Sequence, residues 1–132
     1  MVDRMKKKEL LSYCEEINSK YFHLPKSELP SIQIGDFKTS EFVAFFVFDD
    51  NEILISRKLF AEDDEIIKKE LRHEMIHWYQ SKSGELTDDV HNKMFWDWSR
   101  KLGCFSVIQK DFYDKNPDSN VLRDDIVFKV VE

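Results

Sequence analysis

One uninterrupted segment, residues 62–80, constrains this chain more than any other part of its sequence. It contains neither Gly nor Pro and opens on four consecutive acidic residues, which the dipole at a helix N-terminus favours. A Ser-Lys-Ser-Gly run follows and ends at Gly84, a residue suited to stopping a helix. The apolar residues of the segment recur at helical spacing: Ile67, Leu71, Met75 and Trp78. The segment therefore predicts a long amphipathic helix with one face on a core.

Near the end of this helix, residues 73–77 read His-Glu-Met-Ile-His. His73 and His77 are four residues apart, so they project from one helix face, one turn above the other. Glu74 lies about 100° round from His73, where it can reach a metal-bound water without being a ligand. The alternative interpretation is an amphipathic helix with two surface histidines. A solvated face more often carries Lys and Glu, so we favour a zinc site.

A catalytic zinc needs three protein ligands and one open position. Four downstream residues could supply the third ligand: Glu85, Asp88, Asp89 and His91. We prefer His91, which opens the next helical stretch, residues 90–102, and can point back toward the first helix. Thr87 or Asp88 is the expected N-cap of this stretch and Gly103 its C-cap. Its core-facing positions are expected to be Val90, Met94, Trp98 and Leu102, with Phe95 on an adjoining stripe.

Hydrophobic periodicity predicts the rest of the chain. Residues 5–22 form an amphipathic helix, and residues 31–34 a short strand. Residues 42–48, a polar turn at 49–51 and residues 52–55 indicate a β-hairpin, and residues 125–131 a final strand. The apolar side of the first helix is expected to hold Leu10, Leu11, Cys14, Ile17 and Tyr21. The prediction is one α+β domain over residues 1–132, with a small sheet packed against the motif helix and two further helices in a minimal zincin-like arrangement.

The motif residues resemble the SprT-like metalloprotease domain. The resemblance is carried by residues 71–79 (LRHEMIHWY), by residues 52–60, and by the aromatic helix that follows His91. It covers roughly residues 40–103 and implies a zinc-dependent protease with a HExxH motif and a downstream histidine. Two features differ: Val90 and Asn92 flank His91 where the family often has glycines, and a four-cysteine zinc ribbon is absent.

The two cysteines, Cys14 and Cys104, form no CxxC pair and so exclude a Cys₄ zinc site. Two buried free thiols in a reducing compartment are preferred to a disulfide between them. No signal-peptide h-region and no apolar run of membrane-spanning length is present. We therefore expect a cytoplasmic monomer that does not enter a membrane.

The ligand set predicts a zinc-dependent endopeptidase. His73, His77 and His91 would hold Zn²⁺, and Glu74 would act as the general base on a zinc-activated water. Tyr79 or Tyr113 could assist with oxyanion stabilisation. Glu70 and Asp97 are possible partners of the ligands, although each is more simply a solvated helix residue. In zincins the protein or peptide substrate commonly lies extended along an edge strand, which here would be one strand of the hairpin at residues 42–56.

Partner chemistry is less constrained by the residues. A net charge of −6 does not favour autonomous nucleic-acid binding. The SprT-like resemblance nevertheless makes cleavage of proteins crosslinked to DNA a hypothesis. Two other functions stay open: a catalytically idle zinc-binding interaction module, and a non-peptidase zinc hydrolase that uses the same HExxH helix.

Overall fold

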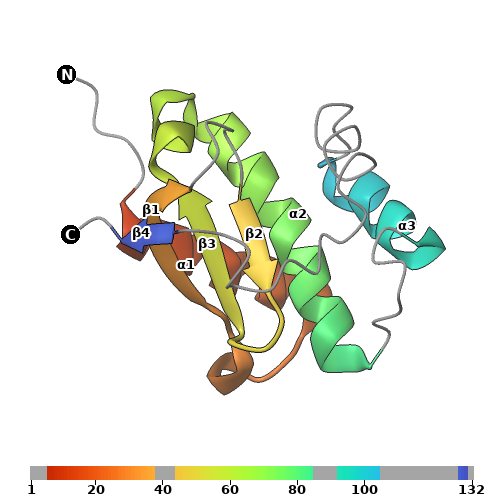
Figure 1. Ribbon diagram of the computed structural model, residues 1–132. Coiled ribbons are helices and arrows are strands. Elements are labelled where there is room, and N and C mark those ends of the chain that lie inside the picture. Colours follow the sequence, from red (N-terminus) through yellow and green to blue (C-terminus); the bar gives the residue numbers. More distant parts are fainter. Residues whose placement is uncertain (1–5, 38–43, 85–91, 105–127, 131–132) are drawn as a thin grey trace.

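The computed structural model describes residues 6–37, 44–84, 92–104 and 128–130. Its main helices are α1 (Lys7–Ile17), α2 (Asp64–Ser83) and α3 (Lys93–Leu102). Its strands are β1 (Ser31–Phe37), β2 (Ala44–Val47), β3 (Glu52–Ser56) and β4 (Phe128–Val130). Shorter helical turns are η1 (Asn18–Phe22), η2 (Lys26–Glu28) and η3 (Arg57–Ala61). This arrangement confirms the predicted α+β class (Figure 1).

The strands form one mixed sheet in the order β2-β3-β1-β4. β2 and β3 pair antiparallel, which confirms the predicted hairpin, and Asn51 takes a left-handed conformation with φ 48° in its turn. β1 runs parallel to β3, and β4 runs antiparallel to β1. Among the described residues β2 is therefore an edge strand, whereas β3 lies inside the sheet.

β1 is longer than the sequence predicted. We expected a strand over residues 31–34. The next two residues, Gly35 and Asp36, are poor strand formers. The strand continues to Phe37, and its last three residues pair with β4. A backbone pairing with a distant segment thus overrides the local propensity.

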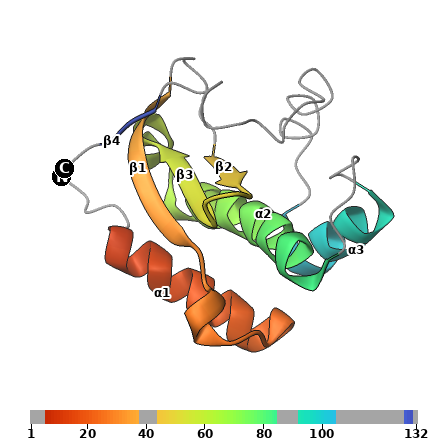
Figure 2. The ribbon, with the colours of Figure 1, turned by 60° about the horizontal axis from the view of Figure 1, so that its bottom comes forward.

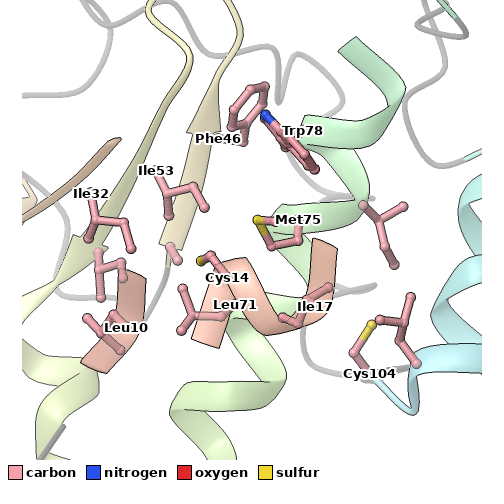
Figure 3. Close-up of a cluster of buried hydrophobic side chains, with 14 of the residues drawn as sticks. Leu10, Cys14, Ile17, Ile32, Phe46, Ile53, Leu71, Met75, Trp78 and Cys104 are labelled. Carbon is pink, nitrogen blue, oxygen red and sulfur yellow. The ribbon is translucent and has the colours of Figure 1, made fainter. Parts of the chain in front are cut away.

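The helices are layered on the sheet. α1 and α2 lie on the same face of the sheet, and α3 packs against α2 (Figure 2). The apolar stripe of α2 packs into the space between the helices and the sheet. Its residues Ile67, Leu71, Met75 and Trp78 are fully buried, as predicted. Figure 3 shows part of this core, with side chains from α1, the sheet and α2 directed into one space.

The first helix differs from its prediction in two details. Its α-helical part ends at Ile17, and the predicted last turn is π-helical, over Asn18–Phe22. Leu10, Cys14 and Ile17 are buried, but Leu11 is 38% exposed. Leu11 lies about 100° round the helix from Leu10, so both cannot face the same core.

The two cysteines are free thiols, and both are buried. Burial raises the pKa of Cys14 to about 12, and it also raises the pKa of Cys104. The preferred interpretation of two buried thiols is therefore confirmed. None of the described helices combines the length and the apolar character that crossing a membrane requires.

Candidate metal centre

α2 presents the HExxH motif, and its two ends explain why it forms. The side chain of Asp63 accepts a hydrogen bond from the backbone N–H of Ile66 at 3.1 Å, and two acidic residues occupy the first turn. Gly84 closes the other end in a left-handed conformation with φ 74°. The helix is 20 residues long and continues to Ser83, so the motif lies near its middle and not near its C-terminal end, as the sequence had indicated.

His73 and His77 are brought together on one side of α2. Their ring centroids are 5.0 Å apart and the ring planes meet at 72°. Each residue is only 3% exposed, so the alternative of two surface histidines is wrong. The Nε2 atoms of both rings are buried. The histidines thus lie as two neighbouring donors inside the protein.

Phe95 of α3 covers this pair. Its ring stacks on His77 with centroids 4.7 Å apart and planes 12° from parallel. The same ring meets His73 edge to face at 4.8 Å. Phe95 is completely buried, and so α3 closes the side of α2 that does not face the sheet. This second covering layer is why a face expected to be polar is buried.

Two further side chains approach His77. The amide oxygen Oε1 of Gln80 lies 2.7 Å from Nδ1 of His77, in a buried contact. Phe48, which follows β2 directly, has its ring centroid 6.4 Å from that of the imidazole, edge to face. The hydrogen bond joins residues three apart on one helix, and the ring contact brings the end of the edge strand to the histidine pair.

Glu74 is completely buried beside the histidines. Transfer of an ionised carboxylate out of water is costly unless it is hydrogen-bonded, paired or near a metal. A helix that only needed to pack would be more stable with an apolar residue at this position. The burial of Glu74 between two buried histidines therefore marks this turn of α2 as chemically specialised.

The two possible partners of the ligands have opposite environments. Glu70 is only 8% exposed, so its interpretation as a solvated residue is wrong: the core around α2 extends to this turn. Asp97 is exposed and accepts a hydrogen bond from Lys93 at 2.8 Å, and Arg100 lies 3.8 Å away. The Lys93 hydrogen bond lowers the pKa of Asp97. Asp97 is thus a solvated helix residue, as the simpler interpretation had it.

α3 begins later than predicted. The expected N-cap at Thr87 or Asp88 is wrong, because Asn92 caps the helix by accepting a hydrogen bond from the backbone N–H of Phe95 at 3.0 Å. Asn caps as well as Asp does, so composition could not select between these positions. Gly103 is the C-cap, as predicted. The buried residues of α3 are Phe95, Ser99 and Leu102, whereas Met94 and Trp98 are only partly buried.

The other predicted site residues fall into two groups. Tyr79 stacks on Phe22 at 4.5 Å and meets Trp98 edge to face at 5.6 Å, so its ring packs between η1 and α3. Five residues lie outside the described part of the chain: Glu85, Asp88, Asp89, His91 and Tyr113. Within the part that is described, no three His, Cys, Asp or Glu side chains form a metal-holding group. Of the three predicted zinc ligands, the structure therefore describes His73 and His77.

The donor chemistry fits a zinc ion. Two imidazoles one helical turn apart are ligands that zinc accepts readily, and a buried carboxylate that is not needed as a ligand stands next to them. Gln80 and Phe95 were not predicted as neighbours of the histidine pair. The spacing of three between His77 and Gln80 was the available signal for the first. Nothing local in the sequence identifies the second.

The chain matches no family model, no curated protein and no solved structure. The resemblance to the SprT-like domain rests on the motif residues alone.

Proposed function

We propose that this chain is a zinc-dependent endopeptidase of the SprT-like kind, acting in the cytoplasm. The observation that carries the proposal is the joint burial of His73, Glu74 and His77 within two successive turns of α2. A fold that needed only a core would not place three ionisable side chains there, since each costs free energy to bury. Buried thiols at Cys14 and Cys104 suit a reducing compartment.

His73 and His77 would hold the zinc, with His91 as the proposed third ligand. The bound metal would lower the pKa of a water and polarise a carbonyl. Glu74 stands next to His73 on α2, from where its carboxylate can take a proton from the attacking water and deliver it to the departing amine. Phe95 and the surrounding core keep bulk water away from these groups, which strengthens their electrostatic interactions.

The substrate we propose is an extended segment of polypeptide. β2 is the edge strand among the described residues, and its backbone can pair with an added strand. Phe48, just past its end, contacts His77, so a peptide paired with β2 would run toward the histidines. Recognition of this kind reads the peptide backbone more than its side chains. A net charge of −6 argues for a protein substrate without tight binding to DNA.

The test compares zinc content and cleavage of an unstructured protein for the wild type, Glu74→Gln and Glu65→Gln. Glu65 lies in the first turn of the same helix with its side chain 79% exposed, so it is a matched control. Loss of a general base costs about 10²- to 10⁴-fold in rate. We expect Glu74→Gln to lose cleavage by that factor and keep its zinc, and Glu65→Gln to keep both.

Two results would contradict the proposal. Cleavage by Glu74→Gln at the wild-type rate would remove Glu74 from the mechanism. Stoichiometric zinc with no cleavage by the wild type, even with added single-stranded DNA, would identify an idle zinc-binding module. The melting temperature of Glu74→Gln should stay level or rise, since buried active-site charges are often kept at a cost in stability.

A further inference from the structure

Gln80 is a buried amide that the proposed mechanism does not use. Its side chain is completely inaccessible to solvent, three residues after His77 on α2. A buried amide costs free energy unless it is hydrogen-bonded, and an apolar residue would fill the same space without that cost. The amide oxygen lies 2.7 Å from Nδ1 of His77. The chemistry of this contact decides what Gln80 does.

An amide oxygen can only accept a hydrogen bond. Nδ1 of His77 must therefore carry the hydrogen and donate it to Oε1 of Gln80. In a neutral imidazole only one nitrogen is protonated, so Nε2 of His77 carries the lone pair. A neutral imidazole with its lone pair on Nε2 is the form that binds a metal through that atom.

Gln80 also removes an ambiguity that ring packing leaves. Phe95 stacks on His77 with the two planes 12° from parallel, which fixes the plane of the imidazole. A half-turn of the ring about its Cβ–Cγ bond would preserve that plane while exchanging Nδ1 with Cδ2 and Nε2 with Cε1. The hydrogen bond from Nδ1 selects one of the two orientations. Stacking and hydrogen bond together fix the direction of Nε2.

We propose that Gln80 is a positioning residue that holds His77 as the Nδ1–H tautomer and directs its Nε2 lone pair toward a zinc ion. The zinc part rests on the proposed function, whereas the tautomer is a property of the metal-free protein. Outer partners of this kind fix ligand orientation, and their loss costs about 10- to 100-fold in metal affinity.

The experiment measures two quantities for the wild type, Gln80→Met and Gln80→Glu. Nitrogen NMR of the metal-free protein reports which ring nitrogen of each histidine carries the hydrogen, and a chelator competition gives the Kd for zinc. Met keeps the length of the side chain but offers no oxygen, while Glu keeps an acceptor at the same distance. His23, which is exposed, is the internal reference in every spectrum.

We expect the hydrogen of His77 on Nδ1 in the wild type and in Gln80→Glu. In Gln80→Met the hydrogen should redistribute between the two nitrogens, and zinc should bind about 10- to 100-fold more weakly. Gln80→Glu should stay close to the wild type in both measurements. If Gln80→Glu keeps the tautomer and zinc affinity that Gln80→Met loses, the loss is due to the missing hydrogen-bond acceptor. A packing defect would not explain it, because Met preserves packing and Glu does not improve it.

The inference is overturned if wild-type His77 carries its hydrogen on Nε2, a result that needs no variant to fold. It is also overturned if Gln80→Met leaves both the tautomer and the zinc affinity unchanged. Failure of the proposed function has a different signature. If the protein binds zinc but Glu74→Gln still cleaves at the wild-type rate, the peptidase mechanism is wrong. The tautomer and zinc affinity measured for the Gln80 variants would not be affected by that result.

Discussion

The motif face of α2 and the outer face of α3 carry similar ionisable side chains in opposite environments. On α2, Glu74 is fully buried and the neighbouring histidines are 3% exposed. On α3, the side chain of Asp97 is 53% exposed and lies between Lys93 and Arg100 on the same helix. From the sequence, both Glu74 and Asp97 are possible members of a metal site. Burial separates them.

The difference shows how a candidate catalytic carboxylate is distinguished from a solvated one. An exposed acid beside two cations on its own helix is solvated, and its ion pairs contribute little to stability. A buried acid has lost its hydration, so the protein retains it only where an interaction or a reaction offsets that loss. The side chain of Phe95 contributes to this difference, because it packs on both histidines that flank Glu74 in the motif.

The largest effect should come from the proposed third ligand. We expect His91→Asn to weaken zinc binding by more than the ~10- to 100-fold that an outer partner contributes, since a ligand is lost outright. His23→Asn is the matched control, because His23 has φ 58° and Asn tolerates that left-handed conformation. Elemental analysis and chelator competition measure both variants. Unchanged zinc in His91→Asn would transfer the third position to Glu85, Asp88 or Asp89.

The next effect concerns the layer that buries the motif. Phe95→Ala removes a fully buried ring and should lower the free energy of unfolding by about 3–5 kcal/mol. Phe60→Ala is the size-matched control and should cost less, because Phe60 is only partly buried. Urea unfolding of the metal-free proteins measures both. An equal loss in the free energy of unfolding for the two variants would show that Phe95 does not pack on the motif face as tightly as its contacts indicate.

The smallest effect is expected on the outer face of α3. Asp97→Asn should leave zinc content, cleavage rate and melting temperature unchanged at neutral pH. The Lys93 hydrogen bond lowers the pKa of Asp97, so any stabilising effect is present at neutral pH and is lost as pH falls through that lowered value. Exposure screens this contribution. A loss of zinc in Asp97→Asn would break the contrast between the two faces.

Several features of this protein could be predicted from short stretches of sequence. Helical periodicity places Ile67 and Leu71 on the core face of α2, and the acidic start and Gly84 bound the helix. The apolar run, polar turn and apolar run predict the β2–β3 hairpin. The spacing of His73 and His77 places them on one helix face. Each of these depends on residues within a few positions of one another, where backbone geometry fixes the relation between side chains.

The tertiary structure decided what surrounds those residues. β1 extends through Gly35 because β4 pairs with it, and the pairing partner lies more than ninety residues away in the chain. The histidine pair is covered because α3 packs against α2 and brings Phe95 onto both rings. Periodicity within one helix predicts which residues share a face, but it does not predict whether a second element covers that face. The sequence thus determined which donors stand together, and packing between distant elements determined that they stand out of water.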